Sequence, residues 1–253
     1  MKRFFFLSLF TILFAAPAIW GQERLLRFEF SMVQIDSTFD AAPPTKISSL
    51  MAYYRSEMER RMMTVVGFAP QEMSAFRPES PLSNFAADAL LSVARQYSKE
   101  PVDFSVTNFG GLRASFPRGE VRLYDVYAVF PFENTLVILD MEGKDVRELF
   151  DNFARRARVE AVGNVTVEAD NGTLRTLTID GAPFDPNRRY KVATIDFLLG
   201  GGDGVAALRN AVSVTETGIT IRDAVLQYIS TLQSEGKDLT TSIDGRVKMT
   251  THE

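Results

Sequence analysis

Cysteine is absent from this sequence and histidine nearly so. Its 253 residues include no cysteine and one histidine, His252, the second residue from the end. Disulfides and thiolate metal sites are therefore excluded. A two-metal phosphoesterase centre normally binds its ions through several His and Asp side chains, and Ser–His and Cys–His nucleophile systems also need a histidine. We therefore expect no catalytic residues within this sequence.

Other patterns that carry chemistry are missing as well. Neither a GxSxG motif nor a phosphate-binding P-loop occurs. Acidic residues are common, but no DxDxDG-like spacing supports a carboxylate-only Mg²⁺ or Ca²⁺ site. The net charge of −4 gives no reason to expect nucleic-acid binding, which usually needs a basic patch. We expect no metal site, no cofactor and no nucleic-acid partner.

One long apolar run stands at the start of the sequence. Lys2-Arg3 precedes FFFLSLFTILFAAPAIWG, which has the form of a secretory signal with cleavage after Ala18 or Gly21. The run is short for a membrane span, and a retained anchor is the alternative. No cysteine stands at the cleavage point, so lipid anchoring there is excluded. Residues 1–21 therefore predict a signal peptide and a periplasmic or secreted protein with no membrane insertion after cleavage.

The remaining sequence, 45% hydrophobic overall, can bury one large core. Alternating apolar residues predict a strand at Leu26–Met32, and Pro43-Pro44 marks a linker, so 22–45 is an N-terminal strand and linker. Helical spacing predicts a helix over 46–65 whose Met-rich stripe serves packing. Residues 46–253 form the main domain.

Periodicity places further elements along this domain. Helices are predicted over 82–97, with Ser83 or Asn84 near its cap, after Glu142-Gly143, and from about Thr220. Strands are predicted around Phe104 and Val106, at 135–141, 164–168, 174–179 and 190–195.

Two glycine-rich breaks hold the candidate binding residues. In the first, Asn108-Phe109-Gly110-Gly111 interrupts a buried strand, and Asn and Gly tolerate the positive φ that turns backbone N–H groups outward. Arg113 follows, with a planar guanidinium suited to an anion or a ribose edge. Pro131 stiffens the chain before Phe132. These residues form either a nucleotide pocket or a glycine turn beside two core phenylalanines. The second break, DFLLGGGDG, contains Phe197 and Asp203.

Five motifs occur in sequence: SPLSNFAADAL, TNFGGLR, FPFENTLVILDMEGKDVRELF, DPNRRYKVATIDFLLGGGDG and the closing DGRV. In this order and spacing they resemble the C-terminal, substrate-binding domain of 5′-nucleotidases, over about residues 46–248. The family's N-terminal metallophosphoesterase domain has no counterpart here. The sequence is thus similar to standalone bacterial versions of this domain, which tend to be encoded beside a separate metallophosphatase.

The resemblance implies an α+β fold, a mixed α/β domain with four layers, α/β/β/α, and a long N-terminal entry helix. It also implies that Asn108, Gly110 and Arg113 line the nucleoside pocket. Phe132 and Phe197 would cover the two faces of the base, and Asp203 would accept hydrogen bonds from ribose hydroxyls.

Some positions depart from the family pattern or have a plainer interpretation. Arg77 is the nearest candidate for a further binding arginine, about one position out of register. Phe109 replaces a small residue, and its ring either narrows the pocket or folds into the core. For Arg113 the plainer alternative to ligand binding, which we favour, is a surface ion pair, and for Asp203 it is a turn residue.

We expect an exported nucleotide- or nucleoside-binding subunit of a split 5′-nucleotidase-like hydrolase that acts in nucleotide catabolism. A separate metallophosphatase chain would supply the metal ions. The alternative is a non-catalytic protein that binds nucleosides or nucleotides for scavenging or sensing. A third interpretation is a structural remnant whose pocket binds nothing.

Overall fold

A computed structural model of the chain describes residues 30–34, 37 and 45–251. The predicted signal peptide and most of the predicted strand Leu26–Met32 lie outside this part. Residues 30–34 have no regular secondary structure, and Phe30 and Met32 are exposed, so the part of that strand which is described is not formed. None of the helices in the described ranges is long and apolar enough to cross a membrane.

The chain divides into two units, Met1–Ser49 and Leu50–Glu253, and the second carries nearly all of the described structure. The helices are α2 (Lys46–Met62), α3 (Pro81–Tyr97), α4 (Leu123–Val129), α5 (Gly143–Arg155), α6 (Asp196–Leu199) and α7 (Ile221–Ser234), with short 3₁₀ helices η2 (Phe109–Gly111), η3 (Gly202–Gly204) and η4 (Ala206–Asn210). The strands are β1 (Val65–Ala69), β2 (Phe104–Thr107), β3 (Gly119–Arg122), β4 (Thr135–Glu142), β5 (Ala161–Gly163), β6 (Val165–Asp170), β7 (Thr173–Ile179), β8 (Ala182–Pro183), β9 (Arg189–Ile195), β10 (Ser213–Thr220) and β11 (Val247–Thr250).

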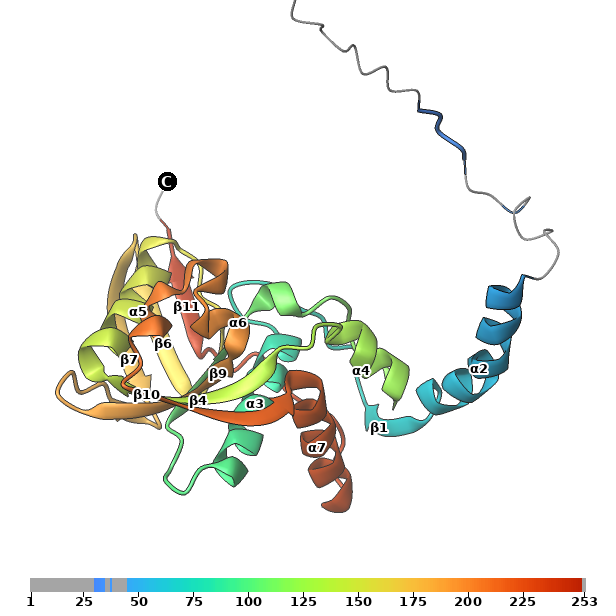
Figure 1. The fold of residues 1–253 in the computed structure, drawn as a ribbon. Coiled ribbons are helices and arrows are strands. Elements are labelled where there is room, and N and C mark those ends of the chain that lie inside the picture. Colours follow the sequence, from blue (N-terminus) through green and yellow to red (C-terminus); the bar gives the residue numbers. More distant parts are fainter. Residues whose placement is uncertain (1–29, 35–36, 38–44, 252–253) are drawn as a thin grey trace, which may run out of the picture. The chain divides into compact units, whose positions relative to one another are not determined.

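These strands form three sheets in a mixed α+β fold (Figure 1). The five-stranded sheet has the order β10-β4-β9-β2-β5, with β2 parallel to β9 and the other neighbours antiparallel. The four-stranded sheet has the order β11-β6-β7-β8, with β11 parallel to β6. A ribbon of β1 and β3 is separate from both. The buried residues form one continuous core.

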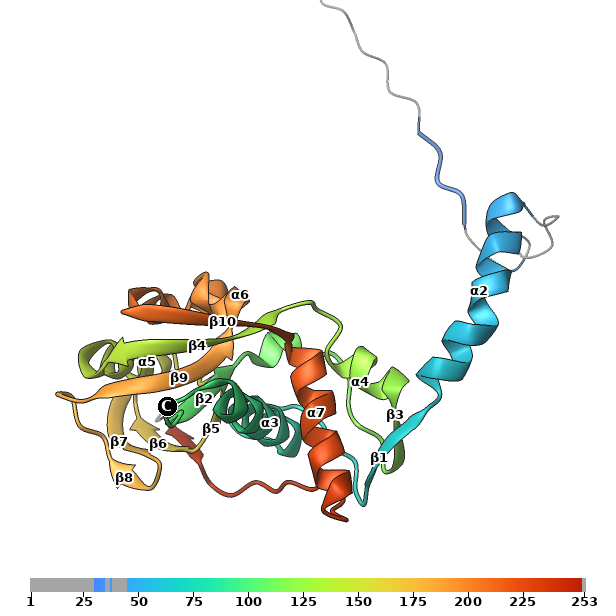
Figure 2. The same cartoon turned by 60° about the horizontal axis from the view of Figure 1, so that its bottom comes forward.

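Two groups of helices cover the five-stranded sheet. Helix α3 packs against β2 and β5 and lies beside α7, as Figure 2 shows. Helix α5 contacts strands of both larger sheets. Its apolar residues recur at helical spacing on one side, and Val146, Leu149, Phe150 and Phe153 are fully buried. This arrangement places the ends of β2 and β9, and the loops that follow them, next to each other.

Local sequence explains where α3 begins. Ser80 caps the helix by accepting a hydrogen bond from the Ser83 N–H, and the Ser83 hydroxyl accepts from the Ser80 N–H. Pro81 follows at the first helical position, where its missing N–H costs nothing. Ser83 was predicted to lie near the cap, and it completes the capping box, while Ser80 is the N-cap residue itself.

The predicted helix over 46–65 is present as α2, but it ends at Met62, because the chain turns into strand β1 at Val65. Its apolar stripe is not packed. None of its residues is buried, and Leu50, Met51, Tyr54 and Met58 are all more than half exposed. Helical spacing reports which residues share a face and not whether that face is covered.

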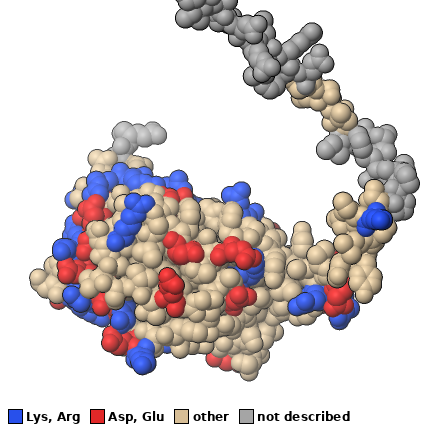
Figure 3. All heavy atoms as spheres, in the orientation of Figure 1, with Lys and Arg blue, Asp and Glu red and all other residues tan. Residues whose placement is uncertain are grey.

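Charged residues of both signs are interspersed on the face of the molecule drawn in Figure 3. Many charged side chains of the described residues form close ion pairs, as in Arg147–Asp151 and Lys248–Glu168. Exposed pairs of this kind add little stability because solvent screens them.

Candidate functional site

The Asn108–Gly111 turn ends β2 and begins the candidate site. It forms the 3₁₀ helix η2, with Asn108 at φ −88°, and neither glycine has a positive φ. The predicted left-handed turn is therefore wrong. Close packing explains the glycines instead, because a Cβ on Gly111 would lie 2.7 Å from Asn108 Oδ1 and one on Gly110 would lie 3.4 Å from Asp203 Oδ2.

Asp203 lies on a second tight turn, after β9 and α6. Its φ of 51° and ψ of 21° are left-handed, and Gly201 and Gly204 on either side also have positive φ. Asn108 Nδ2 donates a 2.8 Å hydrogen bond to Asp203 Oδ2. Arg156 also donates to the Asp203 carbonyl at 2.7 Å. Two loops that are 95 residues apart in sequence thus meet at one hydrogen bond.

Asn108 keeps one polar atom unused. Its side chain is 6% exposed, and its Oδ1 has no hydrogen-bond partner among the described residues. A buried acceptor without a donor is costly. Asn108 also lines a narrow crevice with Thr107, Gly111 and Phe132. The unused oxygen is therefore an acceptor available for a water or a ligand beside that crevice.

The two predicted aromatic residues are half exposed, at 46% for Phe132 and 44% for Phe197. They are therefore not core residues. Phe132 lines the crevice beside Asn108, while Phe197 lies against the other loop, where a Cβ on Gly202 would overlap its ring. Within the described part of the chain the two rings do not contact each other.

An arginine that the sequence patterns did not single out holds the loop of Phe132. Arg222 on α7 is 8% exposed, donates to the Phe130 carbonyl at 3.2 Å and pairs with Glu133 at 2.8 Å. It also lies over the Tyr127 ring, 4.1 Å from the centroid. These contacts connect the residues on both sides of Phe132 to helix α7.

The two predicted arginines differ in their surroundings. Arg113 is exposed and makes one long hydrogen bond, 3.5 Å, to the Gly110 carbonyl. Its guanidinium is therefore free to contact a ligand at the turn. Arg77 is held more firmly: it pairs with Glu160 at 2.9 Å, donates to the Val159 carbonyl and lies over the Phe109 ring at 4.3 Å. The Phe109 ring is half buried against this guanidinium.

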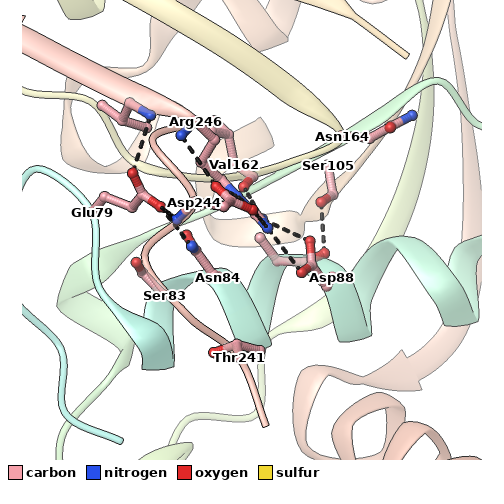
Figure 4. A network of polar contacts seen from close by, with 12 residues as sticks. Glu79, Ser83, Asn84, Asp88, Ser105, Val162, Asn164, Thr241, Asp244 and Arg246 are labelled. Atoms are coloured by element: carbon pink, nitrogen blue, oxygen red, sulfur yellow. Dashed lines mark hydrogen bonds and ion pairs between the residues drawn. The ribbon is translucent and has the colours of Figure 1, made fainter. Parts of the chain in front are cut away.

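A larger cavity lies elsewhere, with a volume of about 740 Å³, beside Asp88, Arg95, Tyr228 and Arg246. Figure 4 shows the network that borders it, in which Arg246 pairs with Asp88 and Asp244. Burial raises the pKa of Asp88, whereas the hydrogen bond from Arg246 lowers the pKa of Asp244. Because the Arg246 guanidinium is already shared by two carboxylates, this network serves to attach the C-terminal segment to α3.

The sequence matches a protein family and is similar to several known proteins. The family described as "5′-nucleotidase, C-terminal domain" matches residues 64–210. The protein UshA of Yersinia enterocolitica is 35% identical over 146 residues, which is 56% of this chain and 26% of that protein. The NAD 5′-nucleotidase of Haemophilus influenzae is 27% identical over 63% of this chain and 31% of its own length.

Structural comparison agrees. The crystal structure of a 5′-nucleotidase precursor from Thermus thermophilus has a TM-score of 0.69 and 27% identity, covering 85% of this chain and 45% of the other. The predicted fold class is thereby confirmed. The chain spans between a quarter and a third of these two curated relatives and under half of the solved structure.

Proposed function

Because the chain belongs to the family of 5′-nucleotidase C-terminal domains, we propose that it is an exported nucleotide- or nucleoside-binding subunit of a split 5′-nucleotidase-like hydrolase. The observation that carries this proposal is the meeting of two loops at the 2.8 Å hydrogen bond between Asn108 and Asp203. Each loop brings one half-exposed phenylalanine, and half-exposed rings are available for stacking on a ligand.

Each residue has a stated role in the proposed site. Phe132 and Phe197 stack on opposite faces of the base, and the Asp203 carboxylate accepts hydrogen bonds from ribose hydroxyls. Asn108 and Gly110 line the nucleoside edge, where the glycine lets the ligand approach the backbone closely. Arg113 turns from its long bond to the Gly110 carbonyl toward the anionic end of the ligand.

Arg77 is the last of the proposed ligand-binding residues, and it lies in the segment before helix α3. Its side chain is 30% exposed and its guanidinium lies over Phe109, so Arg77 is partly accessible at the same turn. Its pairing with Glu160 leaves it less free than Arg113 to change direction.

The proposal assigns hydrolysis to a second chain, a metallophosphatase. No group of three or more His, Cys, Asp or Glu residues that could hold a metal ion occurs in the described ranges. Metal ions would activate the attacking water and stabilise the developing charge on the phosphate. This chain would hold the nucleoside so that the phosphate is presented to them. The basic start and apolar run of residues 1–21 support export.

The test combines this chain with the exported metallophosphatase that the proposal requires from the same locus. We expect AMP hydrolysis by that enzyme to rise when the mature chain is added at micromolar concentration. The rise should disappear with Arg113→Ala or Phe197→Ala, and persist with Phe68→Ala, a half-exposed phenylalanine on β1. A partner that is fully active alone and indifferent to this chain would refute the split-enzyme arrangement. Binding of AMP without that rise would favour the scavenging or sensing protein instead.

A further inference from the structure

Glu160 is a carboxylate buried beside the candidate site. It directly precedes β5, and its side chain is 0% exposed. Glutamate is rarely buried completely unless it is paired, because removing its charge from water is costly. Nothing in the roles given above for the ligand-binding residues requires a carboxylate at this position.

Both carboxylate oxygens of Glu160 have partners, and one of them binds the turn that ends β2. Oε2 accepts a 2.9 Å hydrogen bond from the Phe109 N–H. Oε1 and Oε2 lie 2.9 and 3.0 Å from Nη2 of Arg77, and Oε1 lies 3.4 Å from Nε of Arg158. Two cations and one backbone donor therefore compensate the buried charge.

The Phe109 N–H is a donor that the turn cannot satisfy by itself. It belongs to the first residue of η2, and the first N–H groups of a helix have no partner inside it. Glu160 supplies that partner from a distant segment. Arg77, which pairs with the same carboxylate, lies over the Phe109 ring with its guanidinium carbon 4.3 Å from the ring centroid. Phe109 is thus held through its backbone on one side and through its ring on the other.

Asn108 directly precedes Phe109, the residue that Glu160 and Arg77 hold in place. Its Nδ2 reaches Asp203 at 2.8 Å, and its Oδ1 lies against Gly111. A shift of the Phe109 backbone would move Asn108 with it, since the two share a peptide bond. Sub-ångström placement of polar groups matters for ligand affinity, because a misdirected hydrogen bond loses most of its strength.

We propose that Glu160 is a positioning residue of the nucleotide site, which holds Asn108 toward the ligand through the Phe109 N–H and through Arg77. This inference rests on the proposed function, because it concerns the same ligand. It predicts that the acceptor matters more than the charge. Glu160→Gln keeps a side-chain oxygen for the Phe109 N–H, whereas Glu160→Ala removes it.

Glu79 provides a matched control. It is also a buried glutamate, 4% exposed, and it accepts hydrogen bonds from Asn84 Nδ2 and from the backbone N–H groups of Asp244 and Val247 (Figure 4). These contacts belong to the attachment of the C-terminal segment. Glu79→Ala should therefore lower stability, as Glu160→Ala does, without moving the Asn108 turn.

The experiment measures adenosine affinity by calorimetry, at a temperature where circular dichroism shows each variant to be folded. Glu160→Ala should weaken adenosine binding by at least about tenfold, the effect of losing one well-made hydrogen bond to a charged group. Glu160→Gln should restore the affinity to within about threefold of the parent, and Glu79→Ala should leave it unchanged. Hydrogen exchange of the peptide covering residues 107–113 should be faster in Glu160→Ala than in Glu79→Ala.

Two outcomes would overturn the inference. If Glu160→Ala binds adenosine as the parent does, Glu160 has no positioning role. If Glu79→Ala loses as much affinity as Glu160→Ala, the loss reflects general destabilisation. Absence of adenosine binding by the parent protein would refute the proposed function itself and the role of Glu160 with it, and this result is distinguishable from the first two.

Discussion

Replacement of Phe132 or Phe197 by alanine should separate ligand stacking from folding stability. Stacking of a base on an aromatic ring is worth about 1–3 kcal/mol. Loss of one ring should therefore weaken adenosine binding by about 5- to 150-fold, since each 1.4 kcal/mol is about tenfold in the dissociation constant. Because the two rings sit in different loops and do not contact each other, each single change should weaken binding on its own.

The cost to folding follows from exposure. Replacing a fully buried phenylalanine by alanine typically costs about 3–5 kcal/mol. Phe132 and Phe197 are 46% and 44% exposed, so each alanine variant should lose about half of the free energy that a fully buried phenylalanine contributes. We expect each variant to lose about 1.5–2.5 kcal/mol of unfolding free energy and to remain folded at 25 °C.

Phe68 on β1 is the control, because it is 45% exposed and lies on the ribbon of β1 and β3. Phe68→Ala should lose a similar amount of stability while adenosine affinity stays within about twofold of the parent. Denaturant unfolding measures the first quantity and titration calorimetry the second. Folded Phe132→Ala and Phe197→Ala variants that bind adenosine as tightly as Phe68→Ala would refute the stacking argument.

Three further changes test other contacts. Arg113→Lys keeps the charge but loses the planar guanidinium with its paired donors, so AMP affinity should fall several-fold while the melting temperature stays unchanged. A large fall in melting temperature at constant AMP affinity would instead assign Arg113 a structural role. If Arg77 acts through Phe109, Arg77→Ala should weaken the binding of adenosine and of AMP by the same factor. If Arg77 contacts the phosphate directly, the change should weaken AMP binding more than adenosine binding, and calorimetry with both ligands distinguishes the two results. The pKa of Asp244 lies below its ordinary value of 3.8 because of the hydrogen bond from Arg246, so its stabilising contribution is complete above that value and is lost as pH falls through the lowered pKa. Thermal melts from about pH 5 to about pH 3 should therefore show a smaller loss of stability for Asp244→Asn than for the parent, and equal losses would contradict this.

Regular elements with a strong apolar pattern were predictable from the sequence. Strands β4 and β9 lie within one residue of the expected bounds, and helix α5 begins where it was expected, after Glu142, because their buried faces repeat with clear periods. The ribbon of β1 and β3 was not predicted. Its strands are short and partly exposed, with Phe68 45% exposed, so they carry little periodicity.

The sequence marked the two loops of the candidate site but not their local geometry. The glycine-rich breaks marked the two loops, but the reason for the glycines at 110 and 111 is close packing against Asn108 and Asp203 rather than positive φ. Glu160 could have been suspected, since it stands between Val159 and Ala161 in an apolar stretch. Its partners Arg77 and Phe109 are 83 and 51 residues away, and no local pattern encodes that distance.

A crystal structure of the mature chain with adenosine would test the central claim most directly. The account predicts that adenine lies between the rings of Phe132 and Phe197 and that the ribose hydroxyls donate hydrogen bonds to Asp203. It also predicts that Asn108 lies within hydrogen-bond distance of the nucleoside. Adenosine bound instead in the cavity of about 740 Å³ beside Asp88 and Arg246, or crystals that show no adenosine at saturating concentration, would contradict it.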